Sequence, residues 1–182
     1  MHKVLILGPQ GCGKGTQAVI LAEKLGVPEL SMGALLRSAA AEDGDFALRI
    51  ADIQKRGELV SDVDALTVLK KRLAQPDAAN GYVLDGYPRN EAQYGAYIDF
   101  DVPTHVIVIT VPHDVSMARL LKRAEVEKRV DDTPEVIDRR LQIYHDDTQP
   151  MIMHFAERGI VHEVDGTGSI EEVAEKIWKV FV

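Results

Sequence analysis

The sequence has almost no cysteine and no long apolar run. A single cysteine, Cys12, in 182 residues excludes an intrachain disulfide and a zinc site built from cysteines. No apolar run approaches the roughly 18–20 residues that span a bilayer. The six histidines show no metal-ligand spacing. We therefore expect a reducing, cytoplasmic setting, no membrane partner and no zinc.

The chain also lacks an excess of positive charge. Its formal net charge is -8, whereas nucleic-acid-binding proteins usually carry a basic face, so we expect no nucleic-acid partner. A small anionic ligand remains compatible with this balance, provided that its site is locally basic. The length of 182 residues suits one domain with one sizeable core.

Short apolar runs alternate with helical patterns along the chain. The runs that read as strands are 4–7, 82–84, 106–109 and 160–161. The helical patterns cover about 16–25, 33–41, 46–56, 62–73, 91–98, 114–125, 134–157 and 169–181. This alternation predicts an α/β domain with a mostly parallel sheet, whose ligands bind at the carboxyl ends of the strands.

Two segments interrupt the alternation. Residues 31–60 are helical in pattern and insert no obvious strand, and residues 122–132, KRAEVEKRVDD, are densely charged. An isolated charge run is most often a solvated loop. Both segments read as excursions from the sheet.

The strongest motif is GPQGCGKGTQ at residues 8–17, between the first apolar run and a helical pattern. It nearly fits the phosphate-binding loop G-x-x-x-x-G-K-[ST]. Gly15 occupies the place of the hydroxyl, which follows one residue later at Thr16. A glycine-rich loop in this context directs backbone N–H groups at phosphates, and Lys14 is expected at the β- and γ-phosphates of a nucleoside triphosphate.

A magnesium ion is expected to accompany that nucleotide. Because Gly15 has no hydroxyl, direct ligation by Thr16 is less secure, and we expect the metal to be held through water near Asp85 and Thr16. Asp85 has an alternative interpretation as a capping carboxylate. Cys12 has two interpretations as well, a small residue tolerated in a tight loop or a thiol activated by the helix dipole.

Five arginines fall in the loop after the strand at 82–84, in the two excursions and on the helix that follows: Arg37, Arg89, Arg123, Arg129 and Arg140. Each by itself has the alternative interpretation of a surface residue. Together they form the array that phosphoryl transfer needs, since catalysis there is mostly positioning and electrostatic stabilisation of the transferred group.

These motifs resemble the adenylate kinase family of nucleoside monophosphate kinases. The matching stretches are GxxGxGKGTQ, SxGxLLR, GELV, LDGYPRNEAQ, a short arginine-rich lid ending in RVDD, and RRL, in family order over essentially the whole chain. The resemblance implies the three-layer P-loop NTPase fold, with a parallel five-stranded sheet flanked by helices. It divides the single domain 1–182 into a core (1–30, 61–121 and 133–182), a monophosphate-binding flap (31–60) and a short lid (122–132).

The resemblance also implies an activity and a role for each matching residue. The activity is reversible transfer of the γ-phosphoryl group of ATP to AMP by a monomer. The implied catalytic residues are Lys14, Arg89, Arg123, Arg129 and Arg140. ATP would bind to Gly11, Cys12, Gly13, Lys14, Gly15, Thr16, Arg119, Arg123 and Gly168. AMP would bind to Ser31, Met32, Gly33, Arg37, Glu58, Leu59, Val60, Gly86, Tyr87, Pro88, Arg89, Gln93, Arg129 and Arg140.

Two residues depart from the family pattern S-T-G-D-x-L-R. Met32 replaces the threonine near the acceptor base, and Ala34 replaces an aspartate near Arg37. The resemblance still favours AMP, because pyrimidine-specific relatives tend to carry asparagine where this chain has Gln93, whose amide would read the adenine edge. The departures leave two alternatives open: a kinase for another nucleoside monophosphate, and a nucleotide-binding sensor that has lost catalysis.

Overall fold

The computed structural model describes residues 1–182 except 43, 57, 59 and 128–132. Five strands form one parallel sheet in the order β2-β3-β1-β4-β5. The strands are β1 His2–Leu7, β2 Glu29–Ser31, β3 Gly81–Asp85, β4 His105–Thr110 and β5 Val161–Asp165. The α/β class and the five-stranded parallel sheet are confirmed.

Helices connect the strands in the described part of the chain. They are α1 Lys14–Leu25, α2 Met32–Ala40, α3 Asp45–Lys55, α4 Asp62–Leu73, α5 Glu91–Phe100, α6 His113–Glu127, α7 Pro134–Ile143, α8 Gln149–Glu157 and α9 Ile170–Trp178. A 3₁₀ turn, η1, covers Pro76–Ala78, and a π-helical turn, η2, covers Tyr144–Thr148. No helix among these residues is long and apolar enough to cross a membrane.

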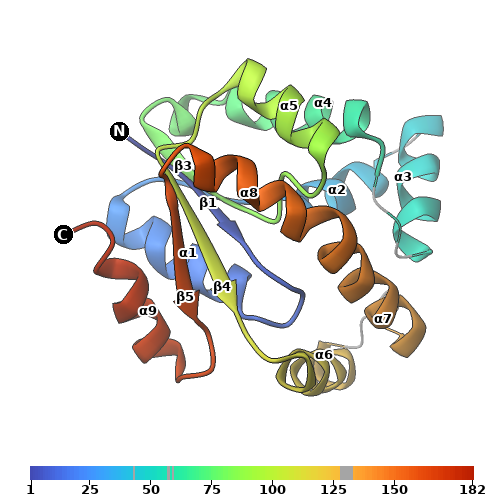
Figure 1. The fold of residues 1–182 in the computed structure, drawn as a ribbon. Helices are drawn as coiled ribbons and strands as arrows, with labels where there is room; N and C mark the ends of the chain where they lie inside the picture. The colour runs from blue at the N-terminus through green and yellow to red at the C-terminus, as the bar shows by residue number, and fades with distance from the viewer. Residues whose placement is uncertain (43, 57, 59, 128–132) are drawn as a thin grey trace.

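Two apolar cores lie on the two faces of the sheet. Residues of α1 and α9 cover one face, and residues of α4, α5 and α8 cover the other (Figure 1). The central strands are buried on both sides, which explains why Val4–Leu7 is an unbroken apolar run. The fold therefore has three layers, helices–sheet–helices.

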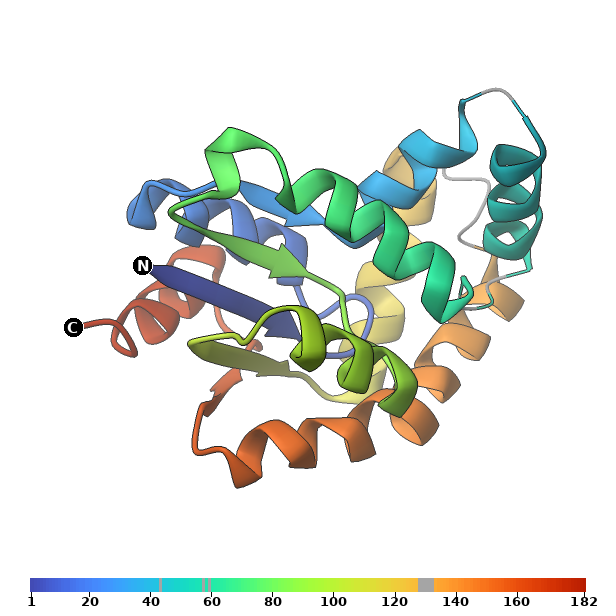
Figure 2. The ribbon, with the colours of Figure 1, turned by 90° about the horizontal axis from the view of Figure 1, so that it is seen from above.

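Figures 1 and 2 agree on where the remaining helices lie. The helices α2, α3, α6 and α7 gather at the end of the sheet toward which the strands point, and both chain termini lie at the opposite end. In the strand order the chain moves from β1 to one side and later to the other, so β1 marks the switch point. Ligands of such sheets bind beside this point, at the carboxyl ends of the strands.

The predicted strands were incomplete. The sequence pattern did not predict β2, because Glu29–Ser31 contains a single apolar residue, Leu30, and shows no periodicity. The last strand covers Val161–Asp165 rather than 160–161, because polar residues at 162, 163 and 165 hide the apolar signal of this edge strand. Ser31, the first residue of the predicted flap, ends β2 and caps α2 by accepting from the Ala34 N–H.

Residues 134–157 are helical throughout, as predicted, but a π-helical turn separates two α-helical parts. The two parts are α7 and α8, and the turn is η2, just before Pro150. Proline has no N–H, so it cannot continue the i→i−4 ladder. The turn places the Thr148 hydroxyl 2.7 Å from the Arg89 carbonyl, to which it donates. The interruption therefore ties α8 to the loop after β3.

Candidate active site

A cavity of about 540 Å³ opens at the carboxyl ends of β1 and β3. Its wall combines the loop after β1, the loop after β3 and helices α2, α4, α6 and α7. The residues are Gln10, Gly11, Gly13, Lys14, Gly15, Thr16, Ser31, Met32, Gly33, Leu36, Arg37, Glu58, Val60, Ala65, Asp85, Gly86, Tyr87, Arg89, Gln93, Arg119, Leu120, Arg123, Arg140 and Ile143.

The glycine loop forms one end of this cavity. Gly8 has φ +143°, and a Cβ there would lie 2.3 Å from the Ile109 carbonyl oxygen, so no other residue fits. Gly13 caps α1 with φ +97°. The free N–H groups and the positive end of the α1 dipole make this end of the cavity an anion site.

The structure shows what surrounds Gly15, which stands where the usual phosphate-loop motif has a hydroxyl residue. A Cβ at Gly15 would lie 3.6 Å from Asp85 Oδ2, an ordinary contact distance. A hydroxyl at position 15 would therefore stand next to the Asp85 carboxylate, whereas Gly15 leaves this space to the cavity. Thr16 follows on α1 and lines the same cavity.

Lys14 lies across the glycine loop. Its ammonium donates to the carbonyl oxygens of Gly8 and Pro9, at 2.8 and 2.7 Å. The partners of the Lys14 ammonium are neutral carbonyl groups, so no carboxylate neutralises its positive charge in these two bonds. The same ammonium lies 3.8 Å from the sulfur of Cys12, which is 2% exposed.

Asp85 ends β3 and faces the cavity. Its Oδ1 is buried and accepts no hydrogen bond from the described residues. Burial raises the pKa of the carboxyl above its ordinary value, and Lys14, Arg89, Arg123 and Arg37 oppose that rise. Desolvation is the larger effect, so the ionised carboxylate is destabilised here despite the surrounding cations.

Arg89 lies in the loop after β3. Its Nε donates to the Gly86 carbonyl at 2.7 Å, which leaves the rest of the guanidinium to the cavity. Burial lowers its pKa, the Asp85 charge opposes this, and Arg140 lowers it further. An arginine pKa begins so high that Arg89 stays charged. Arginines of α2, α6 and α7 line the same cavity: Arg37, Arg119, Arg123 and Arg140.

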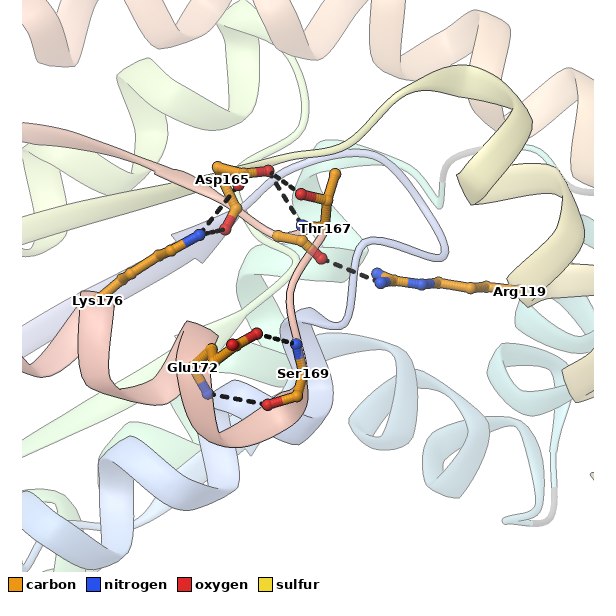
Figure 3. Close-up of polar contacts among 7 residues, drawn as sticks. Arg119, Asp165, Thr167, Ser169, Glu172 and Lys176 are labelled. Carbon is orange, nitrogen blue, oxygen red and sulfur yellow. Dashed lines mark hydrogen bonds and ion pairs between the residues drawn. The ribbon is translucent and has the colours of Figure 1, made fainter.

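Arg119 connects the glycine loop with the loop between β5 and α9. It donates to the Cys12 carbonyl at 3.5 Å. It also donates to the Gly166 carbonyl at 3.0 Å (Figure 3). A Cβ at Gly166 would lie 2.5 Å from Ile109 Cγ2. Close packing and two hydrogen bonds therefore hold this loop against the phosphate loop.

Polar contacts within the β5–α9 loop keep it in shape (Figure 3). Asp165 accepts from the Thr167 hydroxyl at 2.7 Å, from the Thr167 N–H at 3.0 Å and from Lys176 at 3.0 Å. Ser169 and Glu172 form a capping box at the start of α9. The Thr167 hydroxyl, followed by Lys176, lowers the pKa of Asp165 to about 2.

We expect Asp165→Asn to be less stable than the wild type at pH 6, and most of that difference to be lost by about pH 2. A carboxyl with a lowered folded-state pKa stabilises the fold above its unfolded pKa of about 3.9, and this is lost as the pH falls through the folded value. Thermal unfolding between pH 6 and pH 2 measures the difference. Glu175→Gln, which removes an exposed charge from the same helix, is the control. A difference in stability as large at pH 2 as at pH 6 would contradict the prediction.

The other end of the cavity is largely apolar. Met32, Val60, Ala65 and Tyr87 contribute buried side chains from α2, the segment before α4, α4 and the loop after β3, respectively. Gln93 is 3% exposed and adds an amide, whose oxygen accepts from the Arg89 N–H at 2.9 Å. This end suits a flat, mostly apolar ring with one polar edge.

Glu58 lines the cavity between the excursion and α7. Its carboxylate forms ion pairs with Arg56 at 3.0 Å and Arg139 at 3.1 Å. Both arginines are about half exposed, so neither pair stabilises the fold greatly. The contact places the excursion and the helix of Arg140 side by side.

The structure brings most of the predicted site residues into one wall. Cys12, Pro88 and Gly168 are the described residues of the predicted set that do not line it, and Leu59 and Arg129 lie outside the described residues. Five wall residues were not predicted: Gln10, Leu36, Ala65, Leu120 and Ile143. Leu36 follows Met32 by one helical turn, which was a usable signal. For the other four unpredicted wall residues, the sequence gives no signal beyond their position in a loop or helix.

Comparison with known proteins identifies the family of this site. A model of the adenylate kinase family matches residues 6–160. The chain is 41% identical over 180 residues to the adenylate kinase of Xylella fastidiosa (strain M23), covering 96% of each. It is 42% identical to that of Xanthomonas campestris pv. campestris (strain 8004), covering 96% of each, and 41% identical to that of Bifidobacterium longum (strain NCC 2705), covering 96% of this chain and 97% of the relative. The resemblance inferred from the motifs is confirmed, and the chain belongs to the adenylate kinase family.

Proposed function

We propose that the cavity binds ATP at the glycine loop and AMP at the apolar end, and that its arginines stabilise the phosphoryl group in transfer between them. The reaction is the reversible transfer of the γ-phosphoryl group of ATP to AMP, giving two ADP. The observation that supports this division is one cavity whose wall combines the glycine-loop anion site, apolar side chains and five arginines. The comparisons favour neither a different acceptor nor a sensor.

On the donor side, the backbone N–H groups of the glycine loop and Lys14 bind the phosphates of ATP. Arg119 and Arg123 on α6 reach the same phosphates. The β5–α9 loop, which Arg119 joins to the glycine loop, flanks the base through its backbone at Gly168. The base of ATP therefore contacts few side chains, and the affinity for ATP comes chiefly from its phosphates.

On the acceptor side, Arg37 and Arg89 bind the phosphate of AMP, and Arg140 bridges toward the transferred group. Gln93 reads the polar edge of adenine, while Met32, Val60 and Tyr87 contact the ring. We assign Leu59 and Arg129 to this side on the resemblance alone. Closure of the flap and the lid excludes water, which would otherwise compete with AMP for the phosphoryl group.

Magnesium fits the residues present. Asp85 Oδ1 is buried and receives no hydrogen bond from the part of the chain that the structure describes, so it offers a position for a cation or its bound water. Asp85 and Thr16 are the side chains that would hold the hydrated ion, which supplies a positive charge that neutralises the phosphates.

We also propose a cytoplasmic monomer that takes part in nucleotide biosynthesis, consistent with the single buried cysteine.

An acceptor panel tests this proposal. Purified protein with ATP and magnesium is offered AMP, CMP, UMP, GMP or dAMP, and ADP formation is followed. We expect AMP to be used fastest, with two ADP per turnover and no turnover in EDTA. Faster turnover with a pyrimidine monophosphate would overturn the acceptor assignment, and full turnover in EDTA would overturn the magnesium assignment.

A further inference from the structure

Three histidines lie side by side at the end of the sheet opposite the cavity. His2 and His105 are the first residues of β1 and β4, and His162 is the second residue of β5. Between ring centroids, His105 is 6.1 Å from His2 and 5.8 Å from His162. Because β1, β4 and β5 are neighbours in the sheet, these three residues, here called the histidine row, cross it at its amino end.

The histidine row faces the core that α1 and α9 cover. Side chains alternate along a strand, and the residue two places after each histidine belongs to that core. After α9 the chain returns to the row, where the Phe181 ring lies 4.7 Å from that of His105 and 5.8 Å from that of His2, between centroids. The row is therefore part of the surface that holds residues 179–182, named here the C-terminal segment.

The hydrogen bonds of His105 define which of its nitrogens takes up a further proton. Its Nδ1 lies 2.9 Å from the hydroxyl oxygen of Thr104. That hydroxyl donates its single proton to the Lys3 carbonyl at 3.1 Å, so its oxygen accepts from the Nδ1–H of His105. A proton taken up in acid therefore goes to Nε2, and the ring becomes positive between two other imidazoles.

The surroundings of His105 disfavour this charge. Burial lowers the pKa of His105 below its ordinary value of 6.5, and the neighbouring His162 and His2 lower it further. The loss of stability is absent well above pH 6.5 and grows as the pH falls through that value, because the unfolded chain then binds the proton more readily than the folded chain.

Other charged groups on the elements around the row are paired elsewhere or exposed. Lys3 pairs with Asp101, and Asp165 pairs with Lys176. Lys24 of α1 lies over the Trp178 ring, and Glu163 points to the other face of β5, where its charge acts on Tyr144. The exposed groups are Glu23, Glu171, Glu172, Glu175, Lys179 and the two chain ends at Met1 and Val182.

We infer that the histidine row is a pH-dependent attachment for the C-terminal segment, which stays docked while His105 is neutral and is released when His105 is protonated. The physical reason is that a proton on His105 brings like charges together at the ring spacing of the row, under an aromatic side chain that limits access of water. This part of the molecule lies outside the cavity, so the inference does not depend on the proposed function.

Trp178, the one tryptophan in the sequence, reports the position of the segment. It is the last residue of α9, and its ring stacks on that of Phe181 at 6.1 Å between centroids. Acrylamide quenching of its fluorescence measures its exposure in the full chain between pH 8 and pH 5. We expect the quenching constant to be low at pH 8 and to rise in one step with a midpoint below pH 6.5.

Two variants of the row and one control test the cause of this step. His105→Phe keeps a flat ring beside Phe181 but takes up no proton, so the step should disappear. His162→Phe removes one of the two neighbouring like charges, so the midpoint should rise by about half a pH unit. His145→Gln is the control, because His145 is exposed on η2 and pairs with Asp146. It should keep the wild-type step.

The other outcomes would each overturn the inference. They are a wild type without a step, a step that survives in His105→Phe, an unchanged midpoint in His162→Phe, and loss of the step in His145→Gln. Lower quenching in acid than at pH 8 would overturn it as well, since protonated His105 would then attract the Phe181 ring. Thermal unfolding at pH 8 checks that each variant is folded, and His105→Gln replaces His105→Phe if that variant does not fold.

Discussion

Replacing Arg89 by alanine lowers kcat/KM for AMP by about a thousandfold, the loss expected when a charge aimed at the transition state is removed. Arg89 is buried, charged and held by its Nε on the Gly86 carbonyl, so its remaining N–H groups have one fixed direction into the cavity. A coupled assay that follows ADP formation measures the loss. A sensor would show weaker nucleotide binding without any turnover to lose.

Arg72→Ala is the matched control for this change. Arg72 also makes a short ion pair, with Asp77 at 2.8 Å, but it does not line the cavity. We expect its kcat/KM to stay within about twofold of the wild type, since changes of surface ion pairs have small effects. Loss of turnover in Arg72→Ala as large as in Arg89→Ala would mean that the assay reports misfolding, and near-normal turnover in Arg89→Ala would refute its catalytic role.

Asp85→Asn separates activity from stability. We expect magnesium-dependent turnover to fall by about a hundredfold or more, because an amide cannot supply the charge that holds the hydrated ion. We expect the free energy of unfolding at pH 7 to stay the same or rise. The pKa of Asp85 is raised by burial, so ionisation at pH 7 opposes folding, and a neutral amide removes that opposition.

Urea unfolding and the magnesium dependence of turnover measure the two effects. Asp77→Asn is the control, an exposed carboxylate whose pKa is lowered by Arg72 and which should affect neither turnover nor its magnesium dependence. A clear decrease in the stability of Asp85→Asn would show that the cations around the carboxylate outweigh its desolvation. Unchanged turnover in Asp85→Asn would exclude the proposed magnesium site.

The order of the motifs predicted most of the residues that form the glycine-loop end of the cavity. A glycine loop between a buried strand and a helix has one useful geometry, because its backbone angles and free N–H groups are local properties. Gly11, Gly13, Lys14, Gly15 and Thr16 all line the cavity. Long apolar runs likewise predicted the central strands, since burial on both faces leaves a continuous signal.

Short or edge elements were the ones that the pattern missed. The three residues of β2 show no period, and their pairing with β3 depends on a segment more than fifty residues away. The division of 134–157 into two helices depends on Pro150 together with the Thr148 hydroxyl bond to Arg89. Such long-range contacts leave little trace in local sequence.

The sequence by itself determined the family, the fold class and the charges of the site, because these depend on local backbone geometry and on residue type. Only the tertiary structure decided the orientation, burial and hydrogen-bond partners of the side chains in the site. The Arg89 N–H orients the Gln93 amide, and residues from α4 and the loop after β3 pack against Met32. The fold also buries Asp85 Oδ1 with no donor among the described residues. Each of these depends on desolvation and on partners far along the chain, which residue spacing does not encode.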